Sequence, residues 1–187
     1  GAVCMTRPDH VSGTDRCFEA LSHQPNKYDY VINIQGDEPF IQPDQIDLLA
    51  RKLDGITEIA TLAKSLQTAE QLFNPNVVKV FLTAMMEALY FSRSPIPHIR
   101  NTPETEWLSR HKFYKHIGMY AYRSDVLERL TQLSVSSLEK AESLEQLRWL
   151  QNGFKIRVAE TLTETMGIDT PEDLQKALKD LSNTRQV

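Results

Sequence analysis

Strands and helices alternate along most of this chain, and that alternation limits the folds it can adopt. Short apolar, β-branched runs typical of strands are followed by segments with apolar residues at helical spacing. We expect strands at residues 2–6, 29–35, 58–64, 77–83, 88–92, 116–122 and 155–160, and helices at 12–21, 43–53, 68–73, 124–133, 138–152 and 169–181. This order predicts an α/β protein built on a three-layer α/β/α, Rossmann-like sheet.

Residues 77–122 depart from this alternation. Two short strands there are separated by a few residues, which predicts a β-hairpin, and no helix of the same stretch would cover its apolar side chains, Val78, Val80, Leu82, Leu89 and Phe91. We treat residues 1–187 as a single domain in which residues 77–122 form an edge lobe. We expect two copies of that lobe to pair in a homodimer. The alternative is that the hairpin packs back on its own domain.

Composition excludes several classes of protein. The chain has 21 basic and 25 acidic residues and a net charge of −4, without the basic excess of a nucleic-acid-binding protein. No apolar run approaches the ~18–20 residues of a membrane span, and no signal peptide is recognisable. The two cysteines, Cys4 and Cys17, fit no zinc or redox spacing. We therefore expect a cytoplasmic protein with no nucleic-acid or membrane partner.

Two acidic residues stand where an α/β sheet could hold a metal. Asp37 lies in Gln35-Gly36-Asp37-Glu38-Pro39, directly after an expected strand, and ligands of α/β sheets bind beyond the carboxyl ends of strands. Asp169 opens the last expected helix. A pair of carboxylates is a typical protein contribution to a Mg²⁺ site that also uses substrate phosphates. A polar turn at Asp37 and a helix N-cap at Asp169 would explain both segments without a metal.

Other polar residues fall at positions suited to a phosphate-bearing or polyol ligand. Ser12-Gly13 precedes a helix, whose first N–H groups suit an anion, and Arg93 lies in a proline-rich loop, where it could pair with a carboxylate. His116 and Tyr120 share one face of an expected strand. Plain alternatives are a helix cap, an exposed arginine and a packed core face. Glu145 and Gln146 flank the apolar stripe of the helix at 138–152, and the pattern alone favours a solvated face for them.

Six segments taken in order carry a resemblance to a known family. They are DHVSGTDR (9–16), VINIQGDEPF (31–40), YFSRSPIP (90–97), HIGMYAYR (116–123), ESLEQLRWLQNG (142–153) and GIDTPEDL (167–174). Together they resemble the 3-deoxy-manno-octulosonate cytidylyltransferases, and the resemblance covers essentially the whole chain.

The resemblance implies a fold, a reaction and a site. The family fold is similar to that of the sugar nucleotidyltransferases and has a hairpin lobe used in dimerisation. Its reaction joins CTP and 3-deoxy-D-manno-octulosonate (Kdo) into CMP-Kdo and pyrophosphate, which activates Kdo for lipopolysaccharide biosynthesis. Carried over by motif, the Mg²⁺ ligands are Asp37 and Asp169, and the cytidine contacts are Ser12, Gly13 and Gln35. The Kdo pocket is Arg93 for the carboxylate and His116, Tyr120, Glu145 and Gln146 for the hydroxyls.

The chain departs from the family pattern at its start. The family opens with a loop resembling P-A-R-x-x-S-x-R-x-P-G-K, which grips the triphosphate, and that motif is absent here. We expect the native protein to be longer and this chain to lack much of its triphosphate site. Two alternatives stay open: a related cytidylyltransferase for sialic acid or 8-amino-Kdo, and an inactive truncated fragment.

Overall fold

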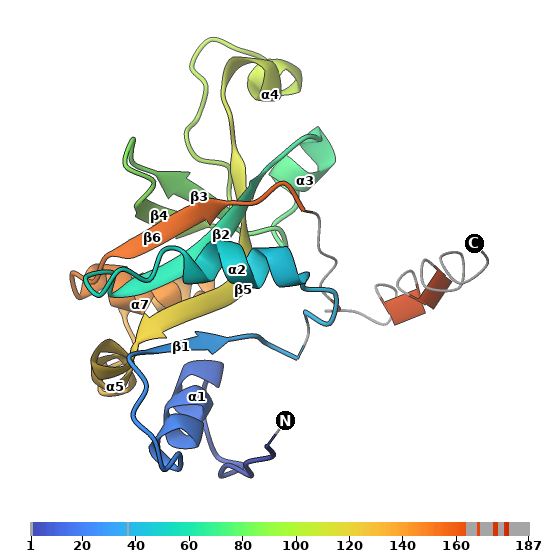
Figure 1. Ribbon diagram of the computed structural model, residues 1–187. Coiled ribbons are helices and arrows are strands. Elements are labelled where there is room, and N and C mark those ends of the chain that lie inside the picture. Colours follow the sequence, from blue (N-terminus) through green and yellow to red (C-terminus); the bar gives the residue numbers. More distant parts are fainter. Residues whose placement is uncertain (1, 37, 164–167, 169–173, 176–177, 180–187) are drawn as a thin grey trace.

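One mixed β-sheet organises the computed structural model, which describes residues 2–36, 38–163, 168, 174–175 and 178–179. The strand order is β4-β3-β5-β2-β6, and β1 pairs with β5 outside that path (Figure 1). Only β2 and β6 run parallel among the described pairings. The strands are β1 (Tyr30–Asn33), β2 (Ile59–Ser65), β3 (Lys79–Leu82), β4 (Ala88–Ser92), β5 (Tyr114–Arg123) and β6 (Ile156–Glu160).

Helices cover both faces of the sheet, which confirms the predicted three-layer α/β/α class. On one face, Leu49 of α2 packs against Ala60, Leu62 and Met119 of β2 and β5. The larger core lies on the other face, where α5 and α7 bury Val126, Leu147 and Trp149 and α1 packs alongside. The helices are α1 (Gly13–Ser22), α2 (Pro43–Ala50), α3 (Ala69–Phe73), α4 (Trp107–Arg110), α5 (Ser124–Thr131), α6 (Ser137–Glu142) and α7 (Gln146–Gln151), with a 3₁₀ turn, η1 (Glu104–Glu106).

Local sequence signals account for where several helices begin and end. The Ser12 hydroxyl accepts a hydrogen bond from the Asp15 amide and caps α1. Pro43 occupies the first turn of α2, where its missing N–H costs nothing. Gly153 follows α7 with a φ of +83°, a conformation that favours glycine, and it ends that helix.

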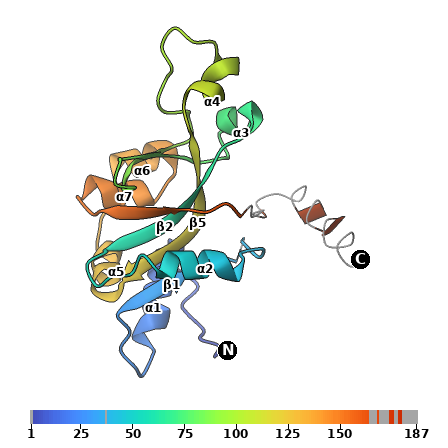
Figure 2. The same ribbon diagram turned by 45° about the horizontal axis from the view of Figure 1, so that its top comes forward.

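The hairpin of β3 and β4 continues the main sheet. Val80 and Phe91 are 3% and 0% exposed inside the larger core, so for these side chains the alternative, that the hairpin packs back on its own domain, is confirmed. Helix α7 contacts β4 and supplies their cover. Leu89 and Met85 remain 52% and 82% exposed. A smaller cluster around Trp107, Phe113 and Leu72 supports the loops near α4, which projects beyond the sheet in both views (Figures 1 and 2).

Four sequence expectations need correction or fall outside the described residues. Residues 2–6 form no strand, because their side chains are largely exposed and no described strand pairs with them. The strand expected at 29–35 is shorter, half-buried and antiparallel to β5 instead of a buried parallel strand. The helix expected at 138–152 is two helices, α6 and α7, because Ser143 adopts a left-handed conformation between them. The helix expected at 169–181 lies mostly outside the described residues.

None of the helices that the structure describes is long and apolar enough to cross a membrane.

Candidate functional site

A cavity of about 870 Å³ lies against β5. Strand β5, the loop after β4 and the start of α7 supply most of its polar lining, and Gln35 and Glu38 reach it from the segment after β1. Six of the residues singled out from sequence line this one cavity: Gln35, Arg93, His116, Tyr120, Glu145 and Gln146. Residues more than 100 positions apart in the chain therefore meet as the sequence motifs predict.

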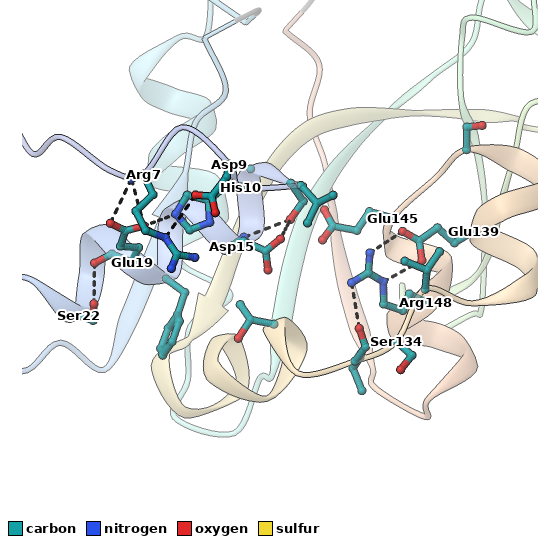
Figure 3. Close-up of a pocket in the computed structure, with 18 of the residues that line it drawn as sticks. Arg7, Asp9, His10, Asp15, Glu19, Ser22, Ser134, Glu139, Glu145 and Arg148 are labelled. Carbon is teal, nitrogen blue, oxygen red and sulfur yellow. Dashed lines mark hydrogen bonds and ion pairs between the residues drawn. The ribbon is translucent and has the colours of Figure 1, made fainter.

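A second cavity, of about 1040 Å³, adjoins the first at Ser143 and Glu145. Ser12 and Gly13 line this second cavity, so the three expected cytidine contacts are divided between the two, with Gln35 in the first. Figure 3 shows Glu145 between Asp15 of α1 and the Arg148 side chain. Glu145 is thus an acidic residue that lines both cavities.

The Arg93 side chain is held by main-chain oxygens. Its Nε donates to the Glu142 carbonyl at 2.6 Å, Nη1 donates to the Pro75 carbonyl at 3.0 Å, and Nη2 donates to the Ser143 carbonyl at 3.5 Å. A guanidinium has five N–H groups, so one hydrogen on each terminal nitrogen is not used by these contacts. The side chain is a preoriented cation at the cavity wall, with donors left for a planar anion.

His116 is a neutral, oriented imidazole. Burial lowers the pKa of His116 from 6.5 to about 3. Its Nε2 lies 3.0 Å from Thr61 Oγ1, and the Thr61 hydroxyl donates to the Met119 carbonyl at 2.8 Å. Because that hydroxyl has a single hydrogen, it accepts from Nε2–H, which leaves Nδ1 of His116 as an acceptor. The Met119 carbonyl is available because β5 has a bulge opposite Thr61 and Leu62.

Glu145 and Gln146 are not on a solvated face, so that sequence interpretation is wrong. Gln146 is 6% exposed, and burial raises the pKa of the Glu145 carboxyl, which accepts a hydrogen bond from the Thr14 hydroxyl at 3.0 Å. The physical reason is the break at Ser143 (φ 54°, ψ 48°), which ends α6 and redirects the chain so that α7 begins at the cavity. A continuous helix would have kept both side chains on its outer surface.

Aromatic rings close the deep end of the cavity. Tyr120 and Tyr122 stack with centroids 5.8 Å apart, and both rings pack nearly perpendicular to the Trp149 ring. Burial raises the pKa of Tyr120 well above 10, so the phenol stays protonated. Neither the Tyr120 hydroxyl nor the Trp149 indole N–H has a hydrogen-bond partner among the described residues. An unpaired buried donor is costly, and a polar ligand nearby would lower that cost.

The expected metal ligands Asp37 and Asp169 both lie outside the described residues, so the metal expectation stays a prediction. Among the described residues, no group of three or more His, Cys, Asp and Glu side chains is arranged to hold a metal. Strand directions do bear on the question. Since β1 and β2 are both antiparallel to β5 and β6 is parallel to β2, the carboxyl ends of β1 and β6 point to the same end of the sheet.

Sequence reasoning missed several residues that support this site. Thr61 orients His116, Thr14 binds Glu145, and Glu142 accepts hydrogen bonds from the Ser92 hydroxyl and the Arg93 amide at 3.0 and 2.9 Å. Thr61 carried no recognisable signal, and Thr14 lies inside the motif DHVSGTDR, which was its only signal. Glu142 stands at the edge of a motif quoted for the family resemblance, and that position was its only signal.

Comparisons with known proteins agree with this geometry. Residues 1–156 match a family model described as cytidylyltransferase. A 3-deoxy-manno-octulosonate cytidylyltransferase of Cytophaga hutchinsonii is 57% identical over 175 residues, which are 93% of this chain and 70% of the relative. The enzyme of the same name from Parabacteroides distasonis is 56% identical over 188 residues, which are 98% of this chain and 75% of the relative.

Solved structures give the same picture. The structure titled CMP:2-keto-3-deoxy-manno-octonic acid synthetase complexed with CTP superposes with a TM-score of 0.87 and 41% sequence identity, over 97% of this chain and 72% of that one. HddC from Yersinia pseudotuberculosis superposes with a TM-score of 0.62 over 94% of this chain and 64% of that one, at 13% identity, which concerns the fold alone.

Proposed function

Because the chain belongs to the 3-deoxy-manno-octulosonate cytidylyltransferase family, we propose that its site transfers CMP from CTP to Kdo and releases pyrophosphate. The protein is a nucleotidyltransferase. The observation that carries the Kdo assignment is the cavity in which the guanidinium of Arg93, held by main-chain carbonyls, stands beside polar groups suited to hydroxyls, with Lys115 as a second cation in the lining. A sugar with a carboxylate and several hydroxyls is the substrate class that this combination fits.

Arg93 is the proposed partner of the Kdo carboxylate. Its three contacts with main-chain carbonyls leave one hydrogen on Nη1 and one on Nη2, which supports two parallel hydrogen bonds to a carboxylate. Nδ1 of neutral His116 accepts from one sugar hydroxyl, and Glu145 and Gln146 bind others. Tyr120 forms the wall behind them.

Positioning accounts for most of the chemistry in this proposal. The anomeric hydroxyl of Kdo attacks the α-phosphorus of CTP in line with the leaving pyrophosphate, and the protein forms no covalent intermediate. Holding the two substrates in reacting geometry supplies the part of the barrier reduction that comes from entropy. Ser12 and Gly13, at the capped start of α1, and Gln35 are the proposed cytidine contacts.

Mg²⁺ is the proposed cofactor, held by Asp37 and Asp169. The support is that both residues follow strands, β1 and β6, whose carboxyl ends point to the same end of the sheet. When bound, Mg²⁺ neutralises developing charge on the phosphates. We expect Asp37→Asn to abolish turnover in the intact protein while its thermal unfolding stays unchanged. Turnover near the wild-type rate at saturating Mg²⁺ would rule out Asp37 as a ligand.

Pyrophosphate release tests the proposed reaction. We expect release with CTP and Kdo together, and little with either alone. The same assay with sialic acid or 8-amino-Kdo in place of Kdo distinguishes a Kdo enzyme from a related cytidylyltransferase. In the proposed binding mode, each analogue changes groups that face the pocket residues His116, Tyr120, Glu145 and Gln146. Faster turnover of either analogue than of Kdo would identify that analogue as the substrate. No release with any of the three sugars would favour the inactive fragment.

We also propose that the protein forms a homodimer, that it lies in the cytoplasm, and that its product is used in lipopolysaccharide biosynthesis. Strand β4 ends the strand order at its side of the sheet, and Leu89 on it is 52% exposed. We propose that two copies pair along this outer edge of the lobe. The Val80 and Phe91 faces take no part, since both side chains are buried in their own core. The cytoplasmic location stays a prediction.

A further inference from the structure

Strand β3 carries a buried lysine that the proposed reaction does not use. Lys79 is 2% exposed, although it lies in an otherwise apolar strand segment. Its ammonium donates to three main-chain carbonyls: Asn74 at 2.9 Å, Val77 at 2.8 Å and Arg93 at 2.6 Å. An ammonium has three hydrogens, so these bonds satisfy it completely. A buried charge is rare unless it is paired in this way.

The three carbonyls belong to two segments that form the wall of the first cavity. Asn74 and Val77 belong to residues 74–78, which connect α3 with β3, and both line the cavity. The same segment supplies the Pro75 carbonyl that accepts from Arg93 Nη1 at 3.0 Å. Arg93 itself follows β4. Lys79 therefore holds the main chain of Arg93 and the segment that orients the Arg93 guanidinium.

Glu142 completes the arrangement from the opposite side. Its carboxylate accepts from the Arg93 amide at 2.9 Å, and its carbonyl accepts from Arg93 Nε at 2.6 Å. Arg93 is thus fixed at its amide and Nε by Glu142 and at its carbonyl by Lys79. Fixing both main-chain groups of a residue restricts where its side chain can point.

We propose that Lys79 is a positioning residue for sugar-acid binding, which holds the Arg93 loop and residues 74–78 so that the guanidinium is preoriented for a carboxylate. This inference rests on the proposed function, because it takes Arg93 as the carboxylate partner. Lys79 touches no substrate and acts through Arg93. Without its ammonium, the Val77 and Arg93 carbonyls lose this donor and the Asn74 carbonyl keeps only the Val77 amide, so the two segments separate or admit water.

The charge of Lys79 is consistent with this role. Burial lowers the pKa of Lys79 to about 8, while the Glu142 carboxylate opposes that shift and the Arg93 guanidinium adds to it. The amine is thus mostly protonated at neutral pH, and its three hydrogens can bond the three carbonyls. Substitution by methionine keeps the length and apolar stem of the side chain and removes the donors.

The test is Lys79→Met in the intact protein, assayed by pyrophosphate release with each substrate varied in turn. We expect the KM for Kdo to rise about tenfold or more, because a guanidinium misplaced by a fraction of an ångström loses its bidentate geometry. The KM for CTP should change less than about twofold. Lys155→Met, at an exposed lysine outside both cavities, is the matched control and should behave as the wild type.

Several outcomes would overturn the proposal. An unchanged KM for Kdo, or equal losses for Kdo and CTP, would give Lys79 a structural role only. If circular dichroism shows that the methionine variant does not fold, Lys79→Gln, which keeps an amide donor, is assayed in its place. Wild-type protein without turnover would contradict the proposed function instead. Calorimetric titration of Kdo alone, onto wild type and variant, then tests the positioning role independently of turnover.

Discussion

Single side chains around the first cavity show how burial sets their chemical state. His116 is neutral because burial lowers its pKa, and Arg93 is oriented because carbonyls of Pro75, Glu142 and Ser143 surround it. In both cases a neighbouring main chain, which the residue's own sequence position does not reveal, decides which hydrogen-bonding groups remain for a ligand. Substitutions at these positions can therefore be tested separately for their effect on ligand binding and on folding stability.

Replacing Arg93 by lysine should weaken Kdo binding selectively. An ammonium keeps the charge but cannot make two parallel hydrogen bonds to a carboxylate, nor all three of the present carbonyl contacts. We expect the KM for Kdo to rise by about tenfold to a hundredfold, from the loss of a charge-assisted bond, with little change for CTP. Steady-state kinetics measure this, with Arg100→Lys in the same loop region as the control. A similar rise for both substrates would move Arg93 to the nucleotide side.

The buried His116 should make the protein less stable in mild acid. The pKa of His116 is about 3 in the folded protein and 6.5 when unperturbed, so between these values the unfolded chain binds a proton that the folded protein does not. The free energy of unfolding should therefore fall as the pH drops below about 6.5, by up to about 1.4 kcal/mol per pH unit from this group.

Urea unfolding at pH 7.5 and pH 5.5 measures this contribution. We expect His116→Gln to lose about 1 kcal/mol less than the wild type between the two pH values. His23→Gln, at an exposed histidine, is the control and should follow the wild type. An identical pH dependence for His116→Gln and wild type would show that His116 is protonated in the folded protein.

Two elements deliver most of the polar groups to the site: the bulged strand β5 and the interrupted helix pair α6 and α7. The bulge frees main-chain carbonyls for the Thr61 hydroxyl, which then orients His116. The break at Ser143 brings Glu145 and Gln146 to the cavity. Each irregularity departs from regular secondary structure at a point where a functional side chain is positioned.

Two substitutions at Ser143 should differ in their effect on stability. A φ of 54° is easy for glycine and strained for a β-branched residue, so Ser143→Gly should be neutral or stabilising and Ser143→Val destabilising by about 1–2 kcal/mol. Thermal unfolding measures both. Because the same turn places Glu145 and Gln146, we also expect Ser143→Val to raise the KM for Kdo. Equal unfolding temperatures for the two variants would contradict the strained turn.

At the scale of the whole molecule, the sheet brings together segments from most of the chain. The first cavity takes residues from Thr14 to Trp149, and its walls come from both the α/β core and the hairpin lobe. The lobe therefore serves the site through Arg93 and Lys79 as well as offering an exposed outer edge. These two roles can be separated by substituting side chains on its inner and outer surfaces.

Disrupting the outer edge of the lobe should separate the proposed dimer. Leu89→Asp places a charge at a side chain that is 52% exposed, so the fold should persist while pairing is lost. Light scattering at micromolar concentration should give a dimer mass for the wild type and a monomer mass for the variant. Ile56→Asp, at a 75% exposed apolar residue outside the lobe, is the control and should leave the mass unchanged. A wild-type monomer would refute the dimer, and a dimer that survives Leu89→Asp would refute this surface.

Periodicity and turn residues were sufficient to predict the α/β class, the helix that Ser12 caps, the hairpin and the end of α7 at Gly153, because these depend on contacts within a few residues. The family resemblance, and not the residue pattern by itself, grouped Arg93, His116 and Glu145. Only the tertiary structure decided that Glu145 and Gln146 face a cavity, that Val80 and Phe91 are buried, and that Lys79 holds the Arg93 loop. Those properties depend on which distant segment packs beside each residue, and the local sequence does not identify that segment.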